Sequence, residues 1–151
     1  MRKVILIIVL FSVNISMFSQ EFSRKDSLRG ELTPLRTCYY VTFYNLDVTI
    51  DEKERFIERS FNEIHFIATA DFETFQIDLA ENMEILIIEF EQTDLDFERE
   101  FDAVFVKFPR VIKKGENQMI RVWYDGYPRE AVNAPWDGGF SWKKDKNDNP
   151  W

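Results

Sequence analysis

The amino-acid sequence predicts an all-β fold, mainly an antiparallel β-sandwich or saddle. Between residues 38 and 126, short apolar segments are separated by polar turns at close spacing. Within several of these segments apolar and polar residues alternate with a period of two, which is typical of half-buried strands. No segment has the sustained period of an amphipathic helix. About seven or eight short strands of this kind suit a single two-sheet domain.

The first predicted strand extends to about Ile50 and has two unequal faces. One face carries only apolar residues, namely Tyr44, Leu46, Val48 and Ile50. The other face mixes apolar with polar residues, namely Val41, Phe43, Asn45, Asp47 and Thr49. Because successive side chains of a strand point to opposite faces, the alternation predicts that the even-numbered face is buried.

The second predicted strand, over residues 56–70, changes its apolar face along its length. Its apolar positions are first the odd-numbered Ile57 and Phe61 and then the even-numbered Ile64, Phe66 and Ala68. A change of face inside one strand predicts a β-bulge or a crossing between two sheets. Steps of three and four residues also permit a helix here, but the β-branched and aromatic content favours the strand.

Further strands are predicted between residues 75 and 124. They span residues 75–79, 83–90, 95–97, 101–106 and 119–124. The 83–90 segment is apolar except for two glutamates, which predicts a strand covered on both faces. The 95–97 segment is expected to be a short edge strand. Pro109 is expected to end the strand that precedes it, because proline cannot donate to a ladder.

Residues 1–19 have the pattern of a secretory signal peptide. Two basic residues precede an apolar run, and a short polar stretch leads to a cleavage position near Ser19. A membrane anchor is the alternative, but the uncharged run contains polar residues and falls short of a roughly 20-residue apolar span. We therefore expect export to the periplasm or cell exterior, without a stable membrane anchor. Residues 20–37 are polar and lack periodicity, which predicts a surface arm.

The chain is acidic, with a formal net charge of −8, and it contains one cysteine and one histidine. An acidic domain lacks the clustered Lys and Arg that phosphate backbones require, which argues against nucleic acid as a partner. Cys38 has no second cysteine for an intrachain disulfide and is expected to be a small buried residue. Nothing in the sequence places His65 beside Cys38 as the base that a catalytic thiol needs.

Residues 127–151 form a segment rich in Pro, Gly and Trp, after the strands of residues 38–126. Pro135 fixes its own backbone, and the pair Gly138-Gly139 permits backbone angles or close approaches that a Cβ would block. A loop this apolar is expected to pack against another surface. The candidate contact residues are Pro135, Trp136, Asp137, Gly138, Gly139, Phe140 and Trp142.

This segment resembles the N-terminal domain of the aminopeptidase N family of zinc metallopeptidases, in a secreted bacterial branch. The resemblance begins at Tyr124-x-Gly126-x-Pro128, and its specific part is the block Asn133-Ala134-Pro135-Trp136-Asp137-Gly138-Gly139-Phe140-x-Trp142. Weaker pieces, such as Tyr44-x-Leu46-Asp47-Val48 and Ile77-Asp78-Leu79, extend the resemblance across most of the chain. The resemblance implies a β-saddle, a catalytic domain of the same parent chain as partner, and peptide substrates for that parent.

The resemblance also implies that this chain is not catalytic by itself. The family binds zinc through a His-Glu-x-x-His helix, and a sequence with one histidine cannot contain that motif. The Gly-x-Met-Glu-Asn segment, by which the family holds the amino end of its substrate, is not in the sequence either. No catalytic or metal-binding residue of the family maps onto the chain, so zinc is expected in the parent enzyme only.

Two other interpretations stay open. A stand-alone secreted β-sandwich could bind glycan or protein through Trp136, Trp142 and Trp151, since exposed aromatic rings stack on sugars. At an inter-domain contact, by contrast, the same rings would be covered by the other domain. The chain could also be a remnant that aggregates through exposed sheet edges.

Overall fold

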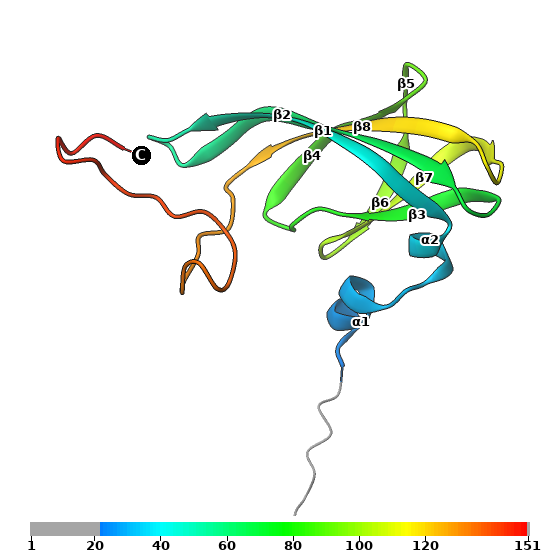
Figure 1. Cartoon of the computed structure of the whole chain (residues 1–151), viewed down its shortest axis with the longest axis horizontal. Helices are drawn as coiled ribbons and strands as arrows, with labels where there is room; N and C mark the ends of the chain where they lie inside the picture. Colours follow the sequence, from blue (N-terminus) through cyan, green and yellow to red (C-terminus); the bar gives the residue numbers. More distant parts are fainter. Residues whose placement is uncertain (1–21, 151) are drawn as a thin grey trace, which may run out of the picture.

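The computed structural model describes residues 22–150, and within them the all-β prediction is confirmed (Figure 1). The two short helices are α1 (Arg24–Gly30) and α2 (Pro34–Thr37). The strands are β1 (Tyr39–Asp51), β2 (Phe56–Ala68), β3 (Phe72–Asp78), β4 (Met83–Phe90), β5 (Thr93–Asp94), β6 (Asp96–Glu100), β7 (Ala103–Ile112) and β8 (Asn117–Gly126). Neither of these helices has the length and apolar content needed to cross a bilayer. The expected signal peptide, residues 1–19, lies outside the described residues.

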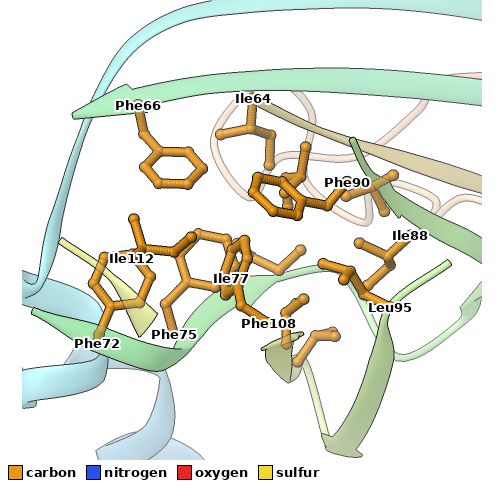
Figure 2. Close-up of a cluster of buried hydrophobic side chains, with 14 of the residues drawn as sticks. Ile64, Phe66, Phe72, Phe75, Ile77, Ile88, Phe90, Leu95, Phe108 and Ile112 are labelled. Atoms are coloured by element: carbon orange, nitrogen blue, oxygen red, sulfur yellow. The ribbon is translucent and has the colours of Figure 1, made fainter. Parts of the chain in front are cut away.

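The strands form two antiparallel sheets that enclose one core. The larger sheet has the order β1-β2-β8-β4-β5 and the smaller one the order β3-β7-β6. Side chains from both sheets meet between them, with Phe66 of β2 and Phe90 of β4 facing Phe75 of β3 (Figure 2). The ring of Phe108, on β7, lies 5.1 Å from the rings of both Phe75 and Phe90, measured between centroids. Phe108 therefore joins the two sheets.

The prediction that the even-numbered face of β1 is buried is wrong. Tyr44 lies opposite Ile64 and Leu46 opposite Asn62, so these residues do share the face that carries the core. Ile64 is only 6% exposed, whereas Tyr44 is 53% and Leu46 62% exposed. The reason is length: β1 and β2 have 13 residues each, whereas β3, β6 and β7 have 7, 5 and 10, so the β1–β2 hairpin extends past the smaller sheet (Figure 1). The alternation of residues in β1 therefore predicts which side chains share a face, but not whether another sheet covers that face.

The β-bulge predicted in the second strand is confirmed. The pairing of β2 with β8 changes register between Ile57 and Ser60. Both residues are buried although three positions separate them, which a regular strand with a period of two does not allow. The extra residue turns the strand and accounts for the change of apolar face seen in the sequence.

Pro109 does not end its strand, contrary to expectation, because β7 continues to Ile112. The pairing of β7 with β3 passes from Lys107 directly to Ile112, and its pairing with β6 ends at Lys107. Pro109 therefore lies in an irregular stretch, where the ladder needs no N–H from it.

Strand β4 is not covered on both faces, as its apolar composition had predicted. Ile88 and Phe90 are buried beneath the smaller sheet, but Leu86 and Ile87 are half-buried. The outer face of the larger sheet has no further layer above it in the described part of the chain. The half-burial comes from neighbouring side chains on the same face, such as Trp123, which lies opposite Ile87.

The polar arm of residues 20–37 contains the two helices, which its lack of periodicity did not predict. Ser23 and Asp26 form a capping box at the start of α1, with the backbone N–H of Asp26 donating to Ser23 Oγ at 3.2 Å. Leu28 is buried, and its carbonyl accepts a 2.9 Å hydrogen bond from the Gln76 side chain of β3. The serine and aspartate three residues apart were the available sequence signal.

Candidate functional site

The candidate site is the C-terminal segment that follows β8. It returns beside the tip of the β1–β2 hairpin (orange to red in Figure 1). The ring of Tyr127 lies 4.9 Å from that of Phe56, and Glu130 forms a 3.1 Å ion pair with Arg55 of the hairpin. We call residues 129–142 the aromatic loop. These contacts fix its base to the sheet.

Asp137 organises the aromatic loop from within. Its Oδ2 accepts hydrogen bonds from the backbone N–H groups of Asn133, at 3.0 Å, and Val132, at 2.7 Å. Arg129 donates to the backbone carbonyl of Asp137 at 3.0 Å. The hydrogen bond from Asn133 is the main cause that lowers the pKa of the Asp137 carboxyl below its ordinary value. The carboxylate thus holds the turn closed in its charged form.

Gly139 allows two parts of the aromatic loop to touch. The N–H of Phe140 donates to the Arg129 carbonyl at 2.8 Å, and the N–H of Ala131 donates to the Phe140 carbonyl at 2.9 Å. Gly139 has φ +103°, and a Cβ there would lie 2.6 Å from the Arg129 oxygen. The close approach expected from the two glycines is therefore confirmed at Gly139, whereas a Cβ at Gly138 would meet open space.

The aromatic side chains of the loop divide into a packed pair and an exposed ring. Phe140 and Trp142 stack with centroids 5.2 Å apart and an interplanar angle of 24°. Trp136 is 88% exposed and touches solvent. Trp142 Nε1 and Asp137 Oδ1 are buried without a hydrogen-bond partner among the described residues. The structure thus brings the predicted contact residues onto one ordered loop, with Pro135 and Trp136 on its exposed part.

Within residues 22–150, no group of three or more His, Cys, Asp or Glu side chains could hold a metal ion. His65 lies on the outer face of β2, where its Nε2 is 3.9 Å from Glu63 Oε2. Glu63 is already engaged, because Asn45 donates to it at 2.7 Å and Arg121 pairs with it. These two partners, Asn45 first, lower the pKa of Glu63. His65 and Glu63 therefore do not form a zinc site, which needs three or four convergent ligands.

Cys38 is buried, as expected. It is 6% exposed, and burial raises the pKa of the thiol to about 11. Since the thiolate is the reactive form, we expect Cys38 in the folded chain to react about 100-fold more slowly with an aromatic disulfide reagent than in the unfolded chain at neutral pH. Stopped-flow absorbance with and without guanidinium measures both rates. Equal rates would contradict this burial.

Replacing Asp137 by Ala is expected to open the aromatic loop, because both backbone donors lose their acceptor. Trypsin should then cleave after Arg129 about tenfold faster, while the free energy of unfolding of the domain changes by less than about 1 kcal/mol. Asp94→Ala, at an exposed carboxylate of β5, is the matched control and should leave cleavage unchanged.

The same contact has a defined dependence on pH. A carboxyl with a lowered pKa stabilises the loop above its ordinary pKa, and this contribution is lost as pH falls through the folded-state pKa. The backbone N–H resonances of Val132 and Asn133 should therefore keep their shifts until the pH falls below the ordinary aspartate range. A titration midpoint at or above the ordinary value of 3.8 would contradict the hydrogen-bonded geometry.

Comparison with known proteins identifies the fold. No family model matches the chain, and no curated protein does. Among solved structures, a mutant of a two-domain M1 zinc metallopeptidase bound to L-arginine matches 73% of this chain and 25% of its own, with a TM-score of 0.58 and 17% identity. An M1 zinc metallopeptidase from Deinococcus radiodurans matches 66% of this chain and 23% of its own, with a TM-score of 0.56 and 18% identity. The chain thus shares a fold with part of these enzymes and spans about a quarter of their length.

Proposed function

We propose that the chain is the non-catalytic N-terminal β domain of an exported zinc metallo-aminopeptidase, which removes N-terminal residues from peptides. The observation that carries this proposal is the fold shared with M1 zinc metallopeptidases over 66–73% of the chain. The motif from Asn133 to Trp142 supports it from the sequence. The part that matches is about a quarter of the length of these enzymes, which leaves the catalytic domain to the remainder of the parent chain.

In this role the domain is structural and shapes the substrate cleft from one side. The aromatic loop is the surface that would meet the catalytic domain. Trp136 offers a large exposed ring that another domain could cover. The ion pair between Arg55 and Glu130 and the Asp137 hydrogen bonds hold this surface in place before contact.

The proposal is tested by assaying the purified chain for zinc and for aminopeptidase activity. We expect no stoichiometric zinc by atomic emission and no hydrolysis of aminoacyl anilides, with or without added zinc. An M1 zinc metallopeptidase assayed in parallel is the positive control. Hydrolysis by this chain that a chelator abolishes would overturn the proposal.

A secreted module that binds glycans is the second candidate, and the exposure of Trp136 is the observation that favours it. Sugar stacking on this ring would quench tryptophan fluorescence, and Trp136→Ala would abolish the quenching. Trp123→Phe is the matched control, because Trp123 is half-buried between Phe61 and Arg59 on the outer face of the larger sheet. Under the aminopeptidase-domain proposal, oligosaccharides leave the fluorescence unchanged.

A further inference from the structure

Of the four strands at the edges of the two sheets, β5, β6 and β3 each have a feature that discourages pairing with another chain. Strand β5 contains only two residues. Strand β6 has the sequence Asp-Phe-Glu-Arg-Glu, so that charged residues fill most of its edge. The edge of β3 is covered by the helices, through the Gln76 hydrogen bond to Leu28 and the ion pair between Arg36 and Asp78. Short length, charge and a covering segment are devices that prevent edge-to-edge pairing.

Strand β1 has none of these devices. It is 13 residues long and contains no Lys, Arg or Pro, and Asp47 is the one charge in its interior. No strand of the described part of the chain pairs with its outer edge. Its apolar side chains are also exposed, among them Tyr40 at 65%, Phe43 at 59% and Leu46 at 62%. A long edge with a single interior charge and several exposed apolar side chains is a template for another strand.

We infer that β1 pairs antiparallel with β1 of a second copy, which joins the two larger sheets into one continuous sheet. A two-fold axis between two copies of β1 places the two strands antiparallel to each other. The contact then uses the free edge of both copies, so it closes as a dimer and adds no further copies. This inference concerns the chain alone and does not depend on the proposed enzyme.

The sequence of β1 suits this pairing in a particular register. With the axis at Leu46, Leu46 faces Leu46 of the second copy, and Tyr44 faces Val48 of that copy. These pairs lie on the inner face of the larger sheet, in the part that the smaller sheet does not cover. Pairing therefore removes some of their apolar surface from water. Asp47 faces Asn45 of the second copy, which separates the two carboxylates. The apolar pairs, together with the separation of the two Asp47 carboxylates, favour a second copy as the occupant.

The test is the mass of the purified chain by light scattering on a sizing column, from low to high micromolar concentration. We expect a reversible dimer. Leu46→Lys places two ammonium groups opposite each other at the axis and should weaken association by at least about tenfold. Phe97→Lys on the charged edge of β6 is the matched control and should leave the dimer intact. Circular dichroism and thermal unfolding verify that both variants fold, because Leu46 is 62% and Phe97 37% exposed.

A chain that stays monomeric at high micromolar concentration would overturn the inference. So would a dimer that survives both Leu46→Lys and Tyr44→Lys, since another surface would then hold it. A monomer whose β1 backbone N–H groups resist hydrogen exchange would assign the edge to another segment of the same chain. Each of these results leaves the zinc and anilide assays unaffected, so the two proposals fail separately.

Discussion

Replacing Phe108 by Ala is expected to lower the free energy of unfolding by about 3–5 kcal/mol, because a fully buried ring leaves a cavity. Phe108 is 1% exposed, and its ring contacts Phe66 of the larger sheet and Phe75 of the smaller one. The substitution therefore removes packing from both sides of the core. Urea denaturation followed by far-ultraviolet circular dichroism measures the loss.

Two controls make the Phe108 prediction specific. Phe108→Leu keeps most of the volume and should lose less than half as much stability as Phe108→Ala. Phe97→Ala removes a phenylalanine that is 37% exposed and should lower the free energy of unfolding by less than about 1 kcal/mol. A Phe108→Ala loss as small as that of Phe97→Ala would mean that the two sheets do not meet at this ring.

Replacing Arg99 by Met is expected to lower the free energy of unfolding by about 1–3 kcal/mol, because partly buried backbone carbonyls lose a charged donor. The Arg99 guanidinium donates to Met83 at 2.6 Å, to Leu79 at 2.8 Å and to Ala80 at 2.6 Å, in each case to the backbone oxygen. It also donates to the Phe101 oxygen at 3.0 Å. One side chain of β6 thereby fixes the turn that leads from β3 to β4 on the other sheet.

Arg110→Met is the matched control for Arg99. Arg110 pairs with Glu91 and Glu116 at the surface, at 3.1 and 2.9 Å, and exposed ion pairs contribute less than about 1 kcal/mol. Arg99→Lys should be nearly as damaging as Arg99→Met, because an ammonium group cannot reach carbonyls spread across the guanidinium fork. Full stability of Arg99→Lys would show that charge, and not the fork, holds the turn.

The sequence predicts where most of the strands lie, but it does not predict which of their faces are buried. Alternation placed Tyr44 and Leu46 on the correct face of β1, because the period of two is a local property of the backbone. Their exposure depends on how far the strands of the opposing sheet extend, which is set by residues far along the chain. The bulge in β2 was predictable, because the apolar positions of this strand change from odd-numbered at Ile57 to even-numbered at Ile64.

In the candidate site, too, some features were predictable from the sequence and others were not. The glycine pair predicted a close approach, and Gly139 makes one against the Arg129 carbonyl. The role of Asp137 was not predictable, because acidic residues are abundant in the chain and only the folded loop brings its carboxylate to the Val132 and Asn133 N–H groups. The four-carbonyl contact of Arg99 gives no sequence signal for the same reason. Pro109 was misleading, because proline is tolerated where a ladder is already irregular.

The central claim, that this chain is the N-terminal β domain of a zinc metallo-aminopeptidase, is tested most directly by reading the coding DNA beyond the Trp151 codon. We expect the frame to continue and to encode Gly-x-Met-Glu-Asn followed by His-Glu-x-x-His, with the second motif able to supply two zinc ligands from one helix face. A stop codon directly after Trp151 in the gene would contradict the claim. The aromatic loop would then have to be explained by a partner outside the chain.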